Sequence, residues 1–167
     1  MNDGLGKKAE QKIKEWLNRP SDGYDFQRIP DQMSGLYGSS NICDFIVYKY
    51  PEHYYIESKS TWNSRFEFSM LTTTQYNGLV AKSKIAHVNG LVMILFASHK
   101  RAFILDIKQI AALIESGKMS INIDKIDTWT FAYGEVPTVP NNRKMLLDYT
   151  GDFVRIWEAA NYDNRNI

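Results

Sequence analysis

The segment 42–59 constrains the fold more than any other part of this chain. It contains two runs rich in β-branched and aromatic residues, and a turn that includes Pro51 separates them. Such runs around a turn predict a β-hairpin. Side chains alternate between the two faces of a strand, so Glu57 and Lys59 project from the same side. Antiparallel pairing of the two strands would carry Asp44 back beside Glu57.

Apolar residues on both faces of the predicted hairpin argue against an ordinary solvated surface for these charges. Asp44 shares its face with Ile46 and Tyr48. The face of Glu57 also carries an aromatic residue, Tyr55. Buried carboxylates are unfavourable unless they are paired or bind a metal ion. Two carboxylates and an amine on one patch therefore predict a site that can hold a hard divalent cation and neutralise a phosphate.

The flanking sequence predicts helices on either side of this hairpin. Residues 4–17 form an amphipathic pattern with one apolar stripe, and Glu10 adjoins that stripe. A second helix is expected over Thr72–His87, with Gln75 near its start and Leu79, Val80 and Ala81 toward the core. The intervening stretch 62–68 is expected to be a loop.

The second half of the chain predicts further strands and helices. The nearly continuous apolar run 90–97 is typical of a central strand that is covered on both faces. A neighbouring strand is expected over 102–107 and a short helix over 108–116. The last helix is expected over 153–160 and would pack on the core or on a second subunit. Together these patterns predict an α/β fold with a central mixed sheet flanked by helices.

Asp44 followed by Glu57-Ser58-Lys59 resembles the motif of the PD-(D/E)xK nuclease superfamily. Cys43 stands where the name of the motif has a proline. Within the superfamily, residues 4–110 are most similar to RecU-type Holliday-junction resolvases and their phage relatives. The order of an aspartate on a strand, a Glu-x-Lys segment, a Phe-containing loop and a helix with a glutamine matches that family. Thr74 stands where a histidine is frequent.

The resemblance implies a restriction-endonuclease-like core and a metal-dependent nuclease site. It implies catalytic roles for five residues: Asp44, Glu57, Lys59, Gln75 and Glu10. Mg²⁺, for which Mn²⁺ can substitute, would be bound by Asp44, Glu57, the backbone carbonyl of Ser58 and Glu10. Lys59 would orient the attacking water or offset charge in the transition state, and Gln75 would position water or phosphate. The partner would be branched DNA in recombination or repair, and the protein would act as a homodimer.

Composition is compatible with a single compact domain and excludes several classes. The chain has 167 residues, of which 44% are hydrophobic, enough for a sizeable core. We expect one nuclease domain over 1–167, with a core over about 4–126 and a C-terminal extension over about 127–167. A single cysteine excludes an intramolecular disulfide framework. The sequence contains no apolar run long enough to predict a membrane span. The polar N-terminus favours a cytoplasmic protein of a bacterium or a phage-infected host.

A formal net charge of +1 excludes a generically basic nucleic-acid coat. DNA binding would therefore depend on a local basic rim that contacts phosphates. The candidate residues for this rim are Lys7, Lys8, Arg28, Arg65, Lys82 and Lys84.

Three functions remain open from the sequence. The first is a structure-selective endonuclease that acts on branched DNA. The second is a restriction-type or DNA-end-processing nuclease of the same superfamily. The third is a non-catalytic DNA-binding module on the same fold, which the intact set of Asp44, Glu57 and Lys59 disfavours.

Overall fold

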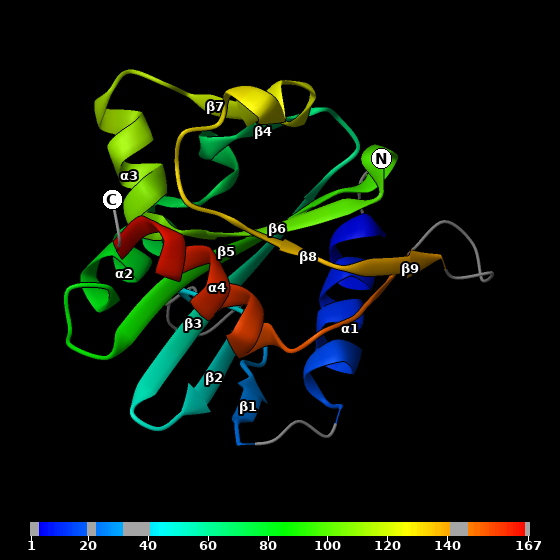
Figure 1. The fold of residues 1–167 in the computed structure, drawn as a ribbon, viewed down its shortest axis with the longest axis vertical. Coiled ribbons are helices and arrows are strands. Elements are labelled where there is room, and N and C mark those ends of the chain that lie inside the picture. The colour runs from blue at the N-terminus through cyan, green and yellow to red at the C-terminus, as the bar shows by residue number, and fades with distance from the viewer. Residues whose placement is uncertain (1–3, 20–22, 32–40, 141–146, 166–167) are drawn as a thin grey trace.

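A six-stranded mixed sheet forms the centre of the protein (Figure 1). The computed structural model describes residues 4–19, 23–31, 41–140 and 147–165. The strand order is β1-β2-β3-β5-β6-β8; β3 and β5 run parallel, and the other neighbouring pairs are antiparallel. The strands of this sheet are β1 (Asp25–Arg28), β2 (Phe45–Lys49), β3 (Glu52–Thr61), β5 (Val88–Phe96), β6 (Arg101–Asp106) and β8 (Gly134–Val136).

Among the described residues, four α-helices and two small sheets surround this centre. The α-helices are α1 (Leu5–Leu17), α2 (Thr73–Lys82), α3 (Ile107–Glu115) and α4 (Phe153–Arg165). One small sheet pairs β4 (Arg65–Glu67) with β7 (Ser120–Asn122), and the other pairs β9 (Thr138–Pro140) with β10 (Leu147–Tyr149). Short 3-10 helices are η1 (Phe68–Met70), η2 (Ala97–His99) and η3 (Ile123–Thr128).

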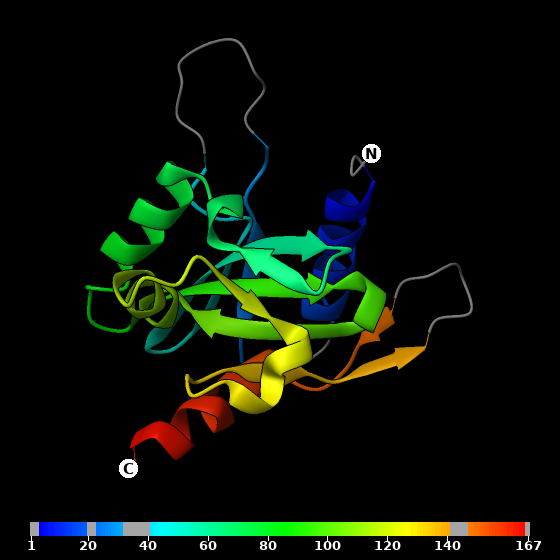
Figure 2. The same cartoon turned by 90° about the horizontal axis from the view of Figure 1, so that it is seen from above.

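Two apolar clusters pack on the two faces of the central sheet. One cluster joins the buried stripes of α1 and α4 to residues such as Phe45, Tyr54 and Leu91. The other joins α2, α3 and the β4–β7 sheet to alternate residues of β5 and β6. Figure 2 shows α2 and α4 on opposite sides of the sheet. The predicted α/β fold, with a central mixed sheet flanked by helices, is confirmed.

Close contact between α2 and β5 depends on Gly90. A Cβ atom at this position would lie 2.7 Å from the backbone carbonyl oxygen of Leu79 in α2. A glycine is therefore required for the helix to pack this tightly on the strand. The rest of β5 is buried from Gly90 to Phe96, as the apolar run predicts for a strand covered on both faces.

Three local predictions were wrong. The stretch 62–68 is not a loop throughout, because Arg65–Glu67 forms β4 and pairs with β7. The helix expected over Thr72–His87 ends at Lys82 and is followed by turns that lead into β5. Ala81 of this helix is exposed instead of facing the core. The helix predicted from hydrophobic periodicity is too long, because no glycine or proline directly follows Lys82 to indicate where the helix ends.

Two described parts of the C-terminal stretch, 127–140 and 147–165, contribute elements that contact the central sheet. β8 pairs with β6 at the edge of the main sheet. Phe153 of α4 makes edge-to-face ring contacts with Trp16 and Tyr54, at centroid distances of 5.9 and 5.4 Å. The predicted terminal helix therefore packs on the core of its own chain. Within the described residues, no helix is both long and apolar enough to span a bilayer.

Candidate active site

The predicted hairpin forms and brings Asp44 next to the Glu57–Lys59 segment. Phe45 pairs with Ile56 in the antiparallel register of β2 and β3. Just before β2, the backbone N–H of Asp44 donates to the carbonyl oxygen of Ile56 at 3.0 Å. The Asp44 carboxylate oxygen Oδ2 accepts a hydrogen bond of 2.8 Å from the N–H of Ser58. The hairpin backbone thus fixes the position of this carboxylate.

Glu57 and Lys59 form an ion pair on the face of β3 that points toward α2. Lys59 Nζ lies 3.1 Å from Glu57 Oε1. The exposed fractions of the two side chains are 17% for Lys59 and 4% for Glu57. The pair is therefore largely removed from water, where an ion pair interacts more strongly but each ion loses more hydration.

Gln75 connects the start of α2 to Glu57. Its backbone N–H donates to Thr72 Oγ1 at 3.2 Å, and its side-chain Oε1 accepts from the N–H of Thr72 at 3.0 Å, which is a capping box. Its side-chain Nε2 donates to Glu57 Oε1 at 2.6 Å. Both ends of the amide are therefore engaged by protein groups. The capping pattern from Thr72 to Gln75 is visible in the sequence, but its link to Glu57 is not.

Burial is the main influence on the two carboxylates. It raises the pKa of Glu57 to about 8, and the nearby charge of Asp44 adds to this, while Lys59 acts in the opposite direction. Burial likewise raises the pKa of Asp44 to about 6, opposed mainly by the hydrogen bond from Ser58. Lys59 offsets the effect of burial on the two carboxylates only in part.

Glu10 approaches from α1, on the other face of the sheet from Gln75. Its Oε2 lies 2.7 Å from Nη2 of Arg28, so an ion pair occupies it. Its charge is close enough to raise the pKa of Asp44 and of Glu57. Glu10 therefore influences the site electrostatically and contacts Arg28 directly.

Two neighbouring carboxylates, those of Asp44 and Glu57, are the side-chain oxygen donors that could hold a metal ion at this site. Among the described residues, no group of three or more His, Cys, Asp or Glu side chains lies close enough to hold a metal ion. Within that part of the chain, the structure gives Asp44 Oδ1 and Glu57 Oε2 no hydrogen-bond donor. Mg²⁺ commonly uses only one or two carboxylates and keeps several waters. Asp44 and Glu57 fit that donor set.

Cys43 adjoins the carboxylates as a buried residue. It is 3% exposed, and burial together with the charges of Glu57 and Asp44 raises the pKa of its thiol to about 12. A thiol with such a pKa is a poor nucleophile at neutral pH. Cys43 fills space beside the site.

The six predicted DNA contacts are spread over several elements. Lys7, Lys8 and Lys84 are exposed. Arg28 is engaged by Glu10 and also lies 3.4 Å from Asp31. Arg65 donates to Ser120 Oγ at 3.3 Å on the β4–β7 sheet. Lys82 Nζ lies 5.3 Å from the centre of the Tyr55 ring, which stands beside Glu57 on the same face of β3.

Comparison with known proteins gives a likeness in structure but none in sequence. No family model and no curated protein matches the chain. Among solved structures, the chain is similar to Hjc of Archaeoglobus fulgidus, a Holliday junction resolvase from an archaeal hyperthermophile. The TM-score is 0.45 and the sequence identity 15%, and the match covers 62% of this chain and 78% of Hjc. This likeness assigns no activity to the present chain, and the RecU-type resemblance stays a prediction.

Proposed function

We propose that this protein is a Mg²⁺-dependent endonuclease that hydrolyses phosphodiester bonds of DNA at Asp44, Glu57 and Lys59. The observation that carries the proposal is the convergence of two desolvated carboxylates and a lysine on one patch of the β2–β3 hairpin. Nothing in the packing of the hairpin requires all three charges there. Clustered carboxylates with raised pKa values are characteristic of functional sites.

Asp44 and Glu57 would hold the metal ion, together with the backbone carbonyl of Ser58. Glu10 would act on the ion through water, because its carboxylate contacts Arg28 directly. A bound Mg²⁺ supplies Lewis-acid polarisation of the phosphate and a lower pKa for water. Mn²⁺, which also favours oxygen ligands, would substitute for it.

Lys59 and Gln75 have different roles in this proposal. Lys59 carries a positive charge at the carboxylates, where it orients the attacking water or stabilises negative charge that develops on the phosphate. Gln75 positions Glu57, because its Nε2 is bound to Glu57 and its Oε1 to Thr72. This assignment replaces direct contact of Gln75 with water or phosphate.

The proposed substrate is branched DNA such as a four-way junction, cut by a homodimer during recombination or repair. This part rests on the resemblance of residues 4–110 to RecU-type resolvases. A dimer supplies two equivalent sites, which two symmetric cuts across a junction require.

A panel of labelled substrates tests this proposal. Four-way junctions, linear duplex and single strands are incubated with Mg²⁺, with Mn²⁺ and with chelator. Paired symmetric nicks confined to the junction support the resolvase. Equal cutting of linear duplex would contradict junction selectivity and favour a restriction-type or end-processing nuclease. Metal-independent binding without cleavage of any substrate would favour a DNA-binding module.

A further inference from the structure

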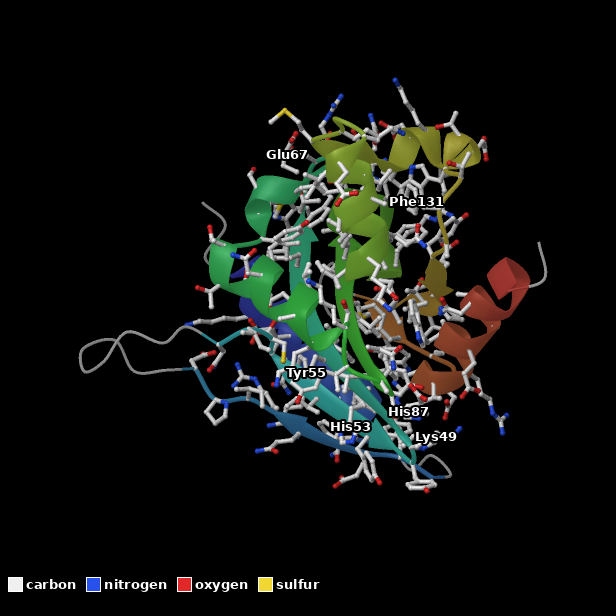
Figure 3. All side chains as sticks on the ribbon, turned by 90° about the vertical axis from the view of Figure 1, so that its left-hand side faces the viewer. Lys49, His53, Tyr55, Glu67, His87 and Phe131 are labelled. Carbon is white, nitrogen blue, oxygen red and sulfur yellow. The ribbon has the colours of Figure 1, made fainter. Side chains whose placement is uncertain are left out.

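A cavity of about 180 Å³ lies beyond the end of β3, where β4, β7 and η3 meet. Figure 1 shows these elements together at one end of the molecule. In Figure 3, Phe131 lies at that end, and Lys49, His53 and His87 lie at the opposite end near the β2–β3 turn. The cavity residues used below are Arg65, Lys118, Lys125, Ser120, Trp129 and Phe131.

The cavity carries an excess of positive charge. In the described part of the chain, none of the ion pairs involves Arg65, Lys118 or Lys125. Arg65 is oriented by the hydrogen bond that its Nη1 donates to Ser120 Oγ at 3.3 Å. Of the two acidic residues of η3, Asp124 and Asp127, Asp124 lies 2.9 Å from His99. Three unpaired cations around one hollow suit a phosphate group.

Two aromatic rings form part of the cavity wall. Trp129 and Phe131 are stacked, with ring centroids 5.0 Å apart and planes inclined by 28°. Trp129 Nε1 donates to the carbonyl oxygen of Asn122 at 3.1 Å, which fixes the indole. Both side chains are only partly buried. Cations that track a backbone beside aromatic rings that stack on bases are the usual means of binding single-stranded nucleic acid.

We propose that this cavity is an accessory DNA-binding site. It holds a phosphate other than the scissile one, together with the adjoining unpaired base of the same strand. The inference rests on the proposed nuclease function and extends it to the substrate. Lys59 and Arg65 are six residues apart in the chain, so the chain can separate them by at most about 20 Å. At about 3.4 Å of helix rise per nucleotide, the cavity would engage the strand within about six nucleotides of the cut.

Binding measurements in the presence of EDTA test the cavity without cleavage. The double variant Arg65→Ala/Lys125→Ala removes two exposed cations, and fluorescence anisotropy reports its affinity for labelled single-stranded DNA. Arg155→Ala is the matched control, because it removes an exposed cation from α4. We expect at least tenfold weaker binding for the double variant and no change for the control. The slope of log K against log salt should fall by about 0.7 for each phosphate that the variant no longer neutralises.

Unchanged affinity and slope in the double variant would overturn the accessory site. An equal loss of affinity for blunt duplex and for single strands would overturn the role of the unpaired base. In cleavage, the double variant should raise KM and leave kcat unchanged, because the cavity binds substrate and transition state alike. A further outcome is that the wild type binds DNA without cleaving any substrate while the double variant binds more weakly. That result would overturn the proposed nuclease function and support the accessory binding site.

Discussion

The substitution Glu57→Gln isolates the energetic consequence of burying a carboxylate at this site. Glutamine has nearly the shape of a protonated glutamate, and its Oε1 can accept the hydrogen bonds that Gln75 and Lys59 make to Glu57. The variant therefore resembles the wild type with Glu57 protonated, at every pH. Any difference that develops between the two proteins as pH rises reports the ionisation of Glu57.

The structure determines the sign and the size of that difference. The pKa of Glu57 is about 8 in the folded protein, against a reference value of 4.5. Between these values the folded state binds more protons than the unfolded state, so the unfolding free energy of the wild type falls as pH rises. The fall approaches about 1.4 kcal/mol per pH unit. The variant should be more stable than the wild type by about 3–5 kcal/mol at pH 9 and by only about 1 kcal/mol at pH 5.

Urea unfolding in EDTA at a series of pH values between 5 and 9 measures this difference. Asp44→Asn provides an internal comparison, because the pKa of Asp44 is about 6 in the folded protein and its effect should end at lower pH. Parallel stability curves for the wild type and Glu57→Gln would refute the reasoning, since they would mean that Glu57 ionises as it does in water. Saturating Mg²⁺ should stabilise the wild type, by about 2.7 kcal/mol at a hundred times Kd, and the variant much less.

Four further substitutions separate chemistry from stability. Lys59→Ala should lower the cleavage rate by about 10²-fold or more, because a charge at the reacting phosphate is removed, with DNA binding in EDTA retained; an unchanged rate would remove Lys59 from the site. Gln75→Ala and Thr72→Ala should each destabilise the protein by about 1 kcal/mol through loss of the capping box. The cleavage rate should fall clearly only for Gln75→Ala, because that substitution also releases Glu57. Equal cleavage rates for the two variants would contradict the positioning role of Gln75. Gly90→Ala should lower the unfolding free energy by about 1–3 kcal/mol in thermal or urea denaturation, because its Cβ would meet the α2 backbone, and unchanged stability would show that α2 can move away.

The sequence predicts the hairpin and the buried stripes well, because both follow from short-range periodicity. Asp44 and the Glu57–Lys59 segment come together because strand alternation and one tight turn leave a single register that buries Phe45 and Val47. The run at β5 is recognisable for a similar reason. Its position next to β3, in a parallel pair, requires a crossover that no local pattern reports.

Contacts between distant segments explain what the sequence does not predict. β4 is three residues long and exists because β7, more than fifty residues later, pairs with it. The ion pair between Glu10 and Arg28 likewise depends on how α1 and β1 meet at the edge of the sheet. The cavity at Arg65 combines residues of β4, β7, η3 and the stretch after η3, so it has no signature in any one segment.

Nicking of a labelled four-way junction by the wild type and by Asp44→Asn, with Mg²⁺ and with EDTA, tests the central claim most directly. The carboxamide keeps the size of Asp44 and removes the charge that would hold the metal ion. The proposed site predicts nicking by the wild type that requires the metal ion and falls by at least about 10²-fold in the variant. Equal nicking by the two proteins, or nicking that persists in EDTA, would contradict a metal-dependent nuclease site at Asp44, Glu57 and Lys59.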